Sequence, residues 1–275
     1  MAVALVTDST ASLSAEVALD RAITVVPLQV VLGAECLEEG TPGGATPALV
    51  AEALAAFRPV STSRPAPATF AAAYRAAIAA GATEIVSVHL SAEMSGTFES
   101  AQLAAREVEV PVHCVDSRQV GIGTGFAVLS AAAARDAGAD GAEVARAAQA
   151  RAAEVSSYFY VDTLEYLRRG GRVGAAAALV GSALSVKPLL VIEDGAVTSL
   201  EKVRTSARAL SRLADLAVAA AGARRVDVGV AHLANDRAAT ELAERLATRL
   251  AAGLEGREVV CGEVGAALGA HVGPG

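Results

Sequence analysis

Small hydroxyl residues gather in two loops where a strand gives way to a helix. Ser61-Thr62-Ser63-Arg64-Pro65 forms one loop, and Ser91 to Thr97 forms another directly before a helix. A helix N-terminus has unpaired N–H groups and a partial positive charge, so it binds carboxylate or phosphate. Gly96 would let the backbone approach such an anion closely. The pattern predicts an anion site, and the alternative is that Ser95 or Thr97 is simply the helix N-cap.

The sequence lacks the motifs of common nucleotide-binding, hydrolase and metal sites. A P-loop requires Gly-Lys followed by Ser or Thr, and neither Lys187 nor Lys202 follows a glycine. The hydrolase motif Gly-x-Ser-x-Gly is absent from the sequence. Gly121-Ile-Gly-Thr-Gly125 follows a strand, but its third glycine comes one residue early for a dinucleotide site, so tight strand–helix packing is the favoured explanation. The four histidines have no metal-ligand spacing, and we expect no metal or cofactor.

Length and charge narrow the class of protein. The chain has 275 residues, 23 basic against 30 acidic, 53% hydrophobic residues and 3% aromatic ones. This length suggests two domains, and the acidic balance without a basic stripe argues against nucleic acid. The longest uncharged stretch, Gln119 to Ala134, is shorter than the ~18 residues of a membrane span.

The N-terminal segment and the cysteines both predict a cytoplasmic protein. No basic segment opens the chain and Asp8 comes early, so we expect no signal peptide. Cys36, Cys114 and Cys261 lie far apart in odd number, which predicts buried free thiols in a cytoplasmic protein.

Strands and helices alternate through the first half of the chain. Strand, polar loop and helix repeat in this order, which is typical of parallel α/β structure. The expected strands are 3–7, 23–31, 84–90 and 111–116, with helices at 47–57, 69–80, 97–107, 126–135 and 140–151. Beyond this, Glu193-Asp194-Gly195 predicts a hairpin turn between strands 189–192 and 196–200. Helices at 206–221 and 236–252 and strands at 158–161, 226–233 and 257–264 complete the second part.

These patterns predict an α/β protein of two unlike domains. Residues 1–155 form a three-layer α/β/α domain with a mainly parallel sheet that carries the hydroxyl loops. Residues 156–275 form a smaller two-layer α+β domain with a mixed sheet.

Several short segments together resemble the DegV family of bacterial fatty-acid-binding proteins, and they keep the family's order over essentially the whole chain. In order, the segments are Val6–Thr10, Thr62–Pro65, Met94–Phe98 with Ser100-Ala101, Val115–Ser117 with Gly121 and Gly123, Val161–Arg172, Leu184–Pro188, Asp194-Gly195, Lys202–Arg204 and His271–Gly275.

The resemblance implies a long-chain fatty acid, such as palmitate, in the cleft between the two domains, with its acyl tail in the smaller one. By similarity, Thr62, Ser95 and Gly96 bind the carboxylate, with His271 nearby. Some members present the acid to an ATP-dependent fatty acid kinase, which forms an acyl phosphate for lipid metabolism. The two family arginines of that partnership correspond to Arg172 and Arg204, for which surface ion pairs are the alternative.

We therefore expect a non-enzymatic fatty-acid-binding protein. Two alternatives stay open: a serine acyl hydrolase that uses Ser95 with His271, and a binder of another anionic small molecule. Two departures from the family pattern concern the head-group loops. Arg64 stands where an uncharged polar residue is expected, and His89-Leu90 replaces a more Ser-rich lead-in.

Overall fold

The computed structural model describes residues 2–179 and 186–275, so Leu184 and Ser185 of one family segment lie outside the described residues. The chain forms two compact units. Unit 1 comprises Met1–Ala45, Thr62–Val155 and Asp194–Ala196, and unit 2 comprises Thr46–Ser61, Ser156–Glu193 and Val197–Gly275. The boundary expected at residue 155 stays a prediction, because both units are discontinuous in sequence.

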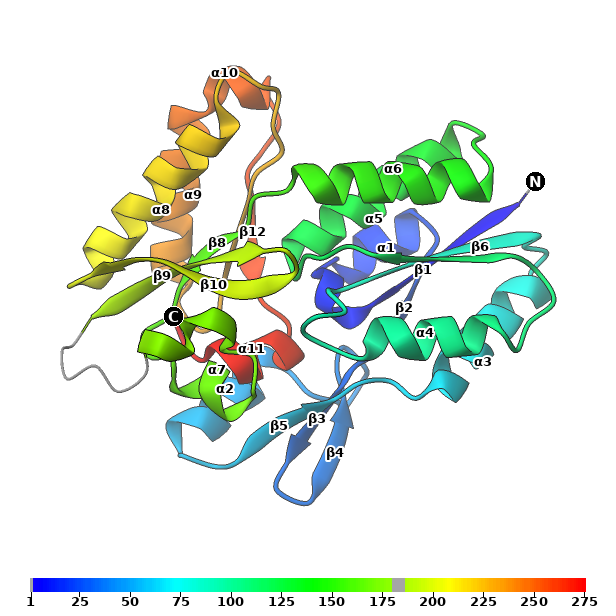
Figure 1. The fold of residues 1–275 in the computed structure, drawn as a ribbon, viewed down its shortest axis with the longest axis horizontal. Coiled ribbons are helices and arrows are strands. Elements are labelled where there is room, and N and C mark those ends of the chain that lie inside the picture. Colours follow the sequence, from blue (N-terminus) through cyan, green and yellow to red (C-terminus); the bar gives the residue numbers. More distant parts are fainter. Residues whose placement is uncertain (1, 180–185) are drawn as a thin grey trace. The chain divides into compact units, whose positions relative to one another are not determined.

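A parallel sheet of the order β2-β1-β6-β7 forms the centre of unit 1 (Figure 1). Its strands are β1 (Val3–Asp8), β2 (Ile23–Val26), β6 (Glu84–His89) and β7 (Val112–Asp116). Its helices are α1 (Ala15–Asp20), α3 (Pro67–Ala79), α4 (Thr97–Ala105), α5 (Ile122–Asp136) and α6 (Gly141–Glu154), with a 3-10 turn at Ser9–Ala11. Because parallel strands end at the same edge, the loops after β1, β6 and β7 lie together.

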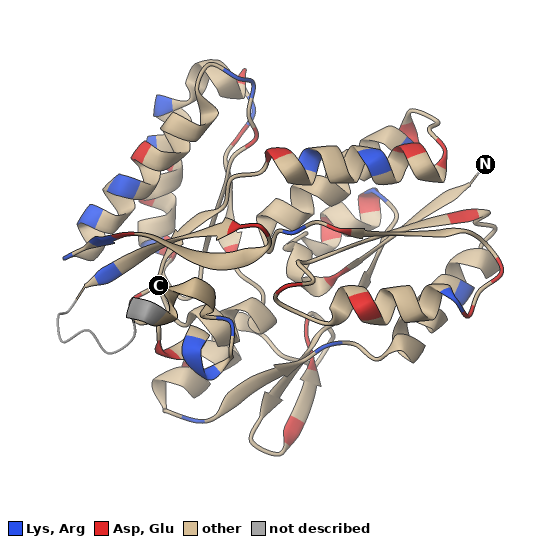
Figure 2. Cartoon of the chain, viewed as in Figure 1, with Lys and Arg blue, Asp and Glu red and all other residues tan. Residues whose placement is uncertain are grey.

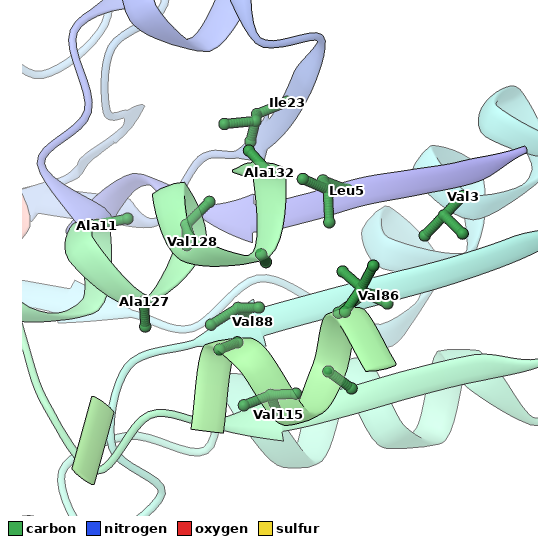
Figure 3. Packing of buried hydrophobic residues seen from close by; sticks show 14 of the residues in the cluster. Val3, Leu5, Ala11, Ile23, Val86, Val88, Val115, Ala127, Val128 and Ala132 are labelled. Carbon is green, nitrogen blue, oxygen red and sulfur yellow. The ribbon is translucent and has the colours of Figure 1, made fainter. Parts of the chain in front are cut away.

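Alternating side chains on these strands face two helical layers. On one face, valines and leucines of β1, β6 and β7 pack against the alanine-rich side of α5 (Figure 3) and of α6; the buried residues include Val3, Leu5, Val86, Val88, Val115, Ala127, Val128 and Val144. On the other face, Val6 and Ile85 pack against Phe70 and Tyr74 of α3 and Ala101 of α4. The period of two along each strand thus produces a three-layer unit, and the predicted fold class is confirmed.

A second small sheet shows where the expected boundaries were wrong. It has the order β4-β3-β5, with β3 (Gln29–Leu32), β4 (Glu35–Glu38) and β5 (Val60–Ser63). The single strand expected over 23–31 is divided into β2 and β3 around Pro27, whose nitrogen has no proton to donate to a sheet. Strands β4 and β5 lie within segments expected to be loops, because their mostly polar, exposed residues lack an apolar alternation.

Unit 2 contains both antiparallel and parallel pairing, in separate sheets. One has the order β10-β9-β8, with β8 (Tyr158–Tyr160), β9 (Lys187–Glu193) and β10 (Ala196–Val203), and β8 is antiparallel to β9. The other pairs β11 (Gly229–His232) with β12 (Val260–Glu263) in parallel. The helices are α2 (Pro47–Ala55), α7 (Glu165–Arg169), α8 (Ser206–Ala221), α9 (Asp236–Arg249), α10 (Ala251–Leu254) and α11 (Ala266–Val272), with a 3-10 segment at Gly174–Leu179.

The turn between β9 and β10 confirms the predicted hairpin. Asp194 and Gly195 have φ angles of 51° and 84°, as a two-residue hairpin turn requires. Of the cysteines, Cys114 is half-buried, and burial raises the pKa of its thiol to about 11. Cys36 and Cys261 are free but exposed, so the expectation of buried thiols is wrong for these two.

Acidic and basic side chains are interspersed on the helices. Along α6, Arg146 and Arg151 lie between Glu143 and Glu154, and α8 likewise carries both signs (Figure 2). Within residues 2–179 and 186–275, no helix is long and apolar enough to cross a membrane.

Candidate functional site

The loop after β6 is closed by hydrogen bonds of Ser91, a fully buried residue. Its carbonyl oxygen accepts the N–H groups of Met94 and Ser95, each at 3.1 Å. Its hydroxyl accepts the Glu93 N–H at 3.2 Å and donates to the carbonyl oxygen of Gly195 at 2.6 Å. Ser95 therefore stands on a well-defined turn at the carboxyl end of the sheet.

Two hydroxyl groups lie side by side where α4 begins. Ser95 Oγ is 2.9 Å from Thr97 Oγ1 and accepts the Thr97 N–H at 3.3 Å. Gly96 occupies the N-cap position, so neither Ser95 nor Thr97 is the N-cap residue itself, although Ser95 accepts the first N–H of the helix. One hydroxyl of the pair donates to the other oxygen, and when Thr97 is the donor the proton of Ser95 can reach an acceptor such as a carboxylate. Ser95 is half-buried and Thr97 is fully buried.

Arg64 lies directly against this helix start. Its Nη1 donates to the carbonyl oxygen of Gly96 at 3.2 Å and to Glu99 Oε2 at 2.6 Å. A Cβ atom on Gly96 would lie 1.9 Å from Arg64 Nη1. The absence of a side chain at Gly96 thus makes room for the guanidinium, which adds a positive charge beside the hydroxyl pair. Sequence reasoning noted Arg64 as a departure and did not predict this contact.

Thr62 is contributed by β5, the short strand that leads to Arg64. It is half-buried between Ser61 and Ser63, which are both exposed. Side chains alternate along a strand, so Thr62 faces the opposite side from these two serines. Thr62, Ser95 and Gly96, three of the four residues predicted to bind the carboxylate, all belong to unit 1.

The buried carboxylate of Asp8 joins the loops after β1 and β6. Oδ1 accepts the N–H of Thr10 at 3.0 Å and its hydroxyl at 2.5 Å. Oδ2 accepts the N–H of Leu90 at 3.2 Å and lies 2.9 Å from His89 Nδ1. Leu90 directly precedes Ser91, so Asp8 anchors the start of the turn that carries Ser95. The family segment Val6–Thr10 pointed to this strand end without indicating the partner, His89.

His271, the fourth predicted contact, lies on α11 in unit 2. Its half-buried ring packs against the Gly170-Gly171 turn, where a Cβ atom on Gly170 would lie 2.1 Å from His271 Nδ1. Burial, reinforced by the positive charge of Arg172, lowers the pKa of His271 to about 4. The imidazole is therefore neutral at neutral pH and acts through one N–H and one bare nitrogen.

The arginines near this turn have different surroundings. Arg168 and Arg169 each form an ion pair of 2.7 Å with Glu165 on the surface of α7, as the ion-pair alternative proposes for this end of the helix. Arg172 instead donates from Nη1 to the carbonyl oxygen of Gly170, beside His271. Arg204 is exposed just after β10.

The glycines after β7 have a packing role. Gly121 begins α5 at a φ of 59°, and a Cβ atom on Gly125 would lie 2.4 Å from the carbonyl oxygen of Ala11. This close approach supports the packing explanation over a dinucleotide site. Among the described residues, no group of three or more His, Cys, Asp or Glu side chains is placed to hold a metal ion.

Comparisons with known proteins agree with this architecture. The family model described as "Uncharacterised protein, DegV family" matches residues 2–275. A DegV domain-containing protein of Streptomyces coelicolor is 52% identical over 273 residues, which cover 99% of this chain and 95% of the relative.

Two solved structures extend the likeness to three dimensions. A DegV family protein of Thermus thermophilus described by its fatty acid binding has a TM-score of 0.90 and 31% identity, covering 100% of this chain and 97% of that one. DegV of Bacillus subtilis, described as a fatty acid binding protein, has a TM-score of 0.89 and 30% identity, covering 100% and 96%. With its central parallel sheet, its hydroxyl loop before α4 and this match over 2–275, the chain belongs to the DegV family.

Proposed function

We propose that this protein binds a long-chain fatty acid, without catalysing a reaction, and presents it to an ATP-dependent fatty acid kinase in the cytoplasm. The observation that carries the first part is the likeness to the Thermus thermophilus protein over the whole chain, since that protein is described by its fatty acid binding. The hydroxyl pair at the start of α4 supports it independently, because it leaves a proton for an anionic oxygen.

We propose that the carboxylate is bound by the hydroxyls of Thr62 and Ser95 and by the backbone at Gly96, with His271 as a further donor. A buried carboxylate without partners costs several kcal/mol, so such donors are needed. A neutral His271 supplies a hydrogen bond without a full ion pair, in keeping with its lowered pKa. Arg64 adds a positive charge beside Gly96, and its ion pair with Glu99 balances that charge when no acid is bound.

The acyl tail supplies most of the affinity in this proposal, and residues 156–275 accommodate it. Burial contributes a gross ~0.8 kcal/mol per methylene, hence on the order of 10 kcal/mol for a sixteen-carbon chain. Association and ordering costs remove several kcal/mol of this. The head-group contacts then determine orientation and the preference for an acid over a neutral lipid.

The proposed kinase contact uses Arg172 and Arg204. Arginine binds phosphate through two parallel hydrogen bonds, which suits an acyl phosphate or the phosphates of ATP. Arg204 is exposed and so is accessible to a partner, and Arg172 lies beside His271, the proposed head-group donor.

Native mass spectrometry tests the binding proposal. The protein is stripped of lipid by mild organic extraction, incubated with palmitate and with 1-hexadecanol as a neutral control, and sprayed from volatile buffer. We expect one palmitate per chain and little retention of the alcohol. If added palmitate does not bind, and no long-chain acid is released from the untreated protein, the proposal is wrong.

The same preparation separates the alternatives. An acyl hydrolase would be labelled at Ser95 by a fluorophosphonate probe, whereas we expect no labelling, because Ser95 Oγ contacts Thr97 Oγ1 and the backbone of Thr97. A binder of phosphorylated metabolites would release palmitate on addition of a short phosphate ester. We expect palmitate to be retained at millimolar concentrations of such an ester.

A further inference from the structure

A row of buried hydrogen bonds runs along one face of the parallel sheet, from α3 to the strand ends below the loop that carries Ser95. Tyr74 on α3 donates its hydroxyl proton to Ser87 Oγ at 2.8 Å, and Ser87 Oγ lies 2.7 Å from His89 Nε2. His89 Nδ1 then lies 2.9 Å from Asp8 Oδ2. All four side chains are fully buried. The row therefore connects the helical layer on one face of the sheet to the loops at its edge.

This row contains an aspartate, a histidine and a serine but is not built as a catalytic triad. Ser87 has no exposed surface and stands between Tyr74 and His89 on the face covered by α3. The ring of Phe70 packs edge-on against His89, with 4.9 Å between the ring centroids. A nucleophile needs access to its substrate, and Ser87 has none, so a role in holding the structure is indicated.

The hydrogen bonds determine which nitrogen of His89 carries the proton. Burial raises the pKa of Tyr74, so its hydroxyl is a proton donor, and the shorter of its two oxygen contacts is Ser87. Ser87 Oγ accepts that proton and can donate its own to His89 Nε2, 2.7 Å away, which is the arrangement with Nε2 as an unprotonated acceptor. Nδ1 then carries the proton and donates it to the carboxylate of Asp8. In this arrangement every hydrogen bond is donated in the same direction, from Tyr74 through Ser87 and His89 to Asp8, and the imidazole is neutral. An imidazolium would instead donate from Nε2 to Ser87, and the Ser87 proton would lose Nε2 as its acceptor.

Asp8 transmits this arrangement to the turn that carries Ser95. Its carboxylate gathers two donors from Thr10 after β1 and the Leu90 N–H after β6. Ser91 follows Leu90, and its carbonyl oxygen holds the N–H of Ser95. A carboxylate with a missing donor would rotate toward another partner, because an unsatisfied buried charge is costly. His89, which is buried on β6, is the side-chain donor that orients the carboxylate of Asp8.

We propose that His89 is a positioning residue for the head-group loop: as the neutral Nδ1–H tautomer it orients Asp8, and Asp8 holds the turn that presents Ser95. The effect on ligand binding rests on the proposed function, whereas the tautomer and the loop geometry do not.

Two amide substitutions at His89 distinguish the role of Nδ1 from that of Nε2. In His89→Asn the side-chain amide can replace Nδ1 and still donate to Asp8, whereas in His89→Gln it reaches the position of Nε2 and serves Ser87 instead. The matched control is Thr7→Val. Thr7 Oγ1 donates to the carbonyl oxygen of Val88 at 2.8 Å, so this change removes a buried hydrogen bond between the same two strands without touching Asp8.

Palmitate affinity and thermal midpoint are measured for the three variants. We expect His89→Gln to weaken binding about tenfold or more, the scale of a hydrogen bond to a charged group. We expect His89→Asn and Thr7→Val to stay within about threefold of the wild type, even where their thermal midpoints fall. Equal loss of affinity in the Asn and Gln variants, or a loss that follows the thermal midpoint in all three, overturns the proposal.

Nuclear magnetic resonance of the ligand-free protein supplies readouts that are independent of fatty acid binding. The ¹⁵N shifts of His89 should identify a protonated Nδ1 and a bare Nε2 at neutral pH, and protonation of both nitrogens contradicts the proposal. The amide resonances of residues 91–97 should move in His89→Gln and stay in place in Thr7→Val. If the wild type binds no palmitate, the proposed function fails, and these resonances still decide the role of His89.

Discussion

His271 occupies the space that a side chain on Gly170 would fill, with 2.1 Å between a Cβ atom at that position and His271 Nδ1. The backbone of Gly170 does not need glycine, since its φ is −73°. The residue is therefore restricted by the imidazole alone. This places the Gly170-Gly171 turn and His271 in one structural cluster, although 101 positions separate them.

The first prediction concerns this contact. Gly170→Ala should push the imidazole from its place and weaken palmitate binding by about as much as His271→Ala, because the methyl group and the ring cannot share the space. Isothermal titration with palmitate measures the effect. Gly171→Ala is the matched control: its φ of 71° strains an alanine, but nothing lies within 4 Å of the new Cβ. It should lower stability by about 1 kcal/mol and leave affinity unchanged. A Gly170→Ala protein with wild-type affinity would refute the role of His271.

The second prediction follows from the pKa of His271. The folded protein holds this pKa at about 4, below the 6.5 of a free imidazole. Between these values the unfolded chain binds a proton that the folded protein does not, so the free energy of unfolding decreases as pH falls from 6.5 toward 4. The loss is roughly 1.4 kcal/mol for each unit of pKa difference.

Urea unfolding at pH 7 and pH 5 measures this slope. His271→Gln should flatten it, and the difference between the two proteins isolates His271 from the other three histidines. An unchanged slope in His271→Gln would mean that the imidazole is not held in the neutral form by the fold.

The third prediction concerns the hydroxyl groups. Thr62→Ala and Ser95→Ala each remove a proposed hydrogen bond to the carboxylate, worth about 1.5–3 kcal/mol, so each should weaken palmitate binding at least tenfold. The double variant should bind palmitate no better than it binds 1-hexadecanol. Ser61→Ala is the control on the same strand, since Ser61 is exposed and faces away from Thr62. Retained affinity in the double variant would remove these residues from the head-group site.

The fourth prediction concerns Arg64 and Gly96. Gly96→Ala should displace the guanidinium, because the new Cβ would lie 1.9 Å from Nη1, and should break the contact with Glu99. The end of an arginine side chain moves easily and the ion pair is exposed, so the stability cost should stay below about 1 kcal/mol.

Combining Gly96→Ala with Arg64→Ala tests this explanation. The arginine change removes the clash, so the two effects on the thermal midpoint should be non-additive. Additive effects would show that Gly96 is required for a reason other than Arg64.

Sequence patterns succeeded where the hydrophobic period is strong. The helix expected over 206–221 has the same bounds in the structure as α8, and β6, α4 and β7 were placed within two residues. The start of α5 was expected after Gly125, whereas the helix begins at Ile122. The turn at Asp194-Gly195 was also predicted correctly, because two residues of positive φ are specific for a hairpin.

The missed elements have weak patterns. α11, which carries His271, consists of alanine and glycine around a single leucine, and its packing depends on close approach, as where a Cβ on Gly269 would meet Leu233. Such small residues give little periodic signal. The pairing of Asp8 with His89 spans 81 positions and follows from the adjacency of β1 and β6, which no local pattern contains.

The packing of α2 against α11 has a consequence for how the protein is made. Both helices belong to unit 2, yet one lies in the first fifth of the chain and the other at its end. On the ribosome, α2 emerges long before its partner helix and cannot pack against it until residues 266–272 have been synthesised. The parallel sheet of unit 1 has all its strands by Asp116 and can form earlier. Packing within unit 2 thus follows synthesis of the sheet strands of unit 1, and loss of α11 would leave α2 without this packing partner.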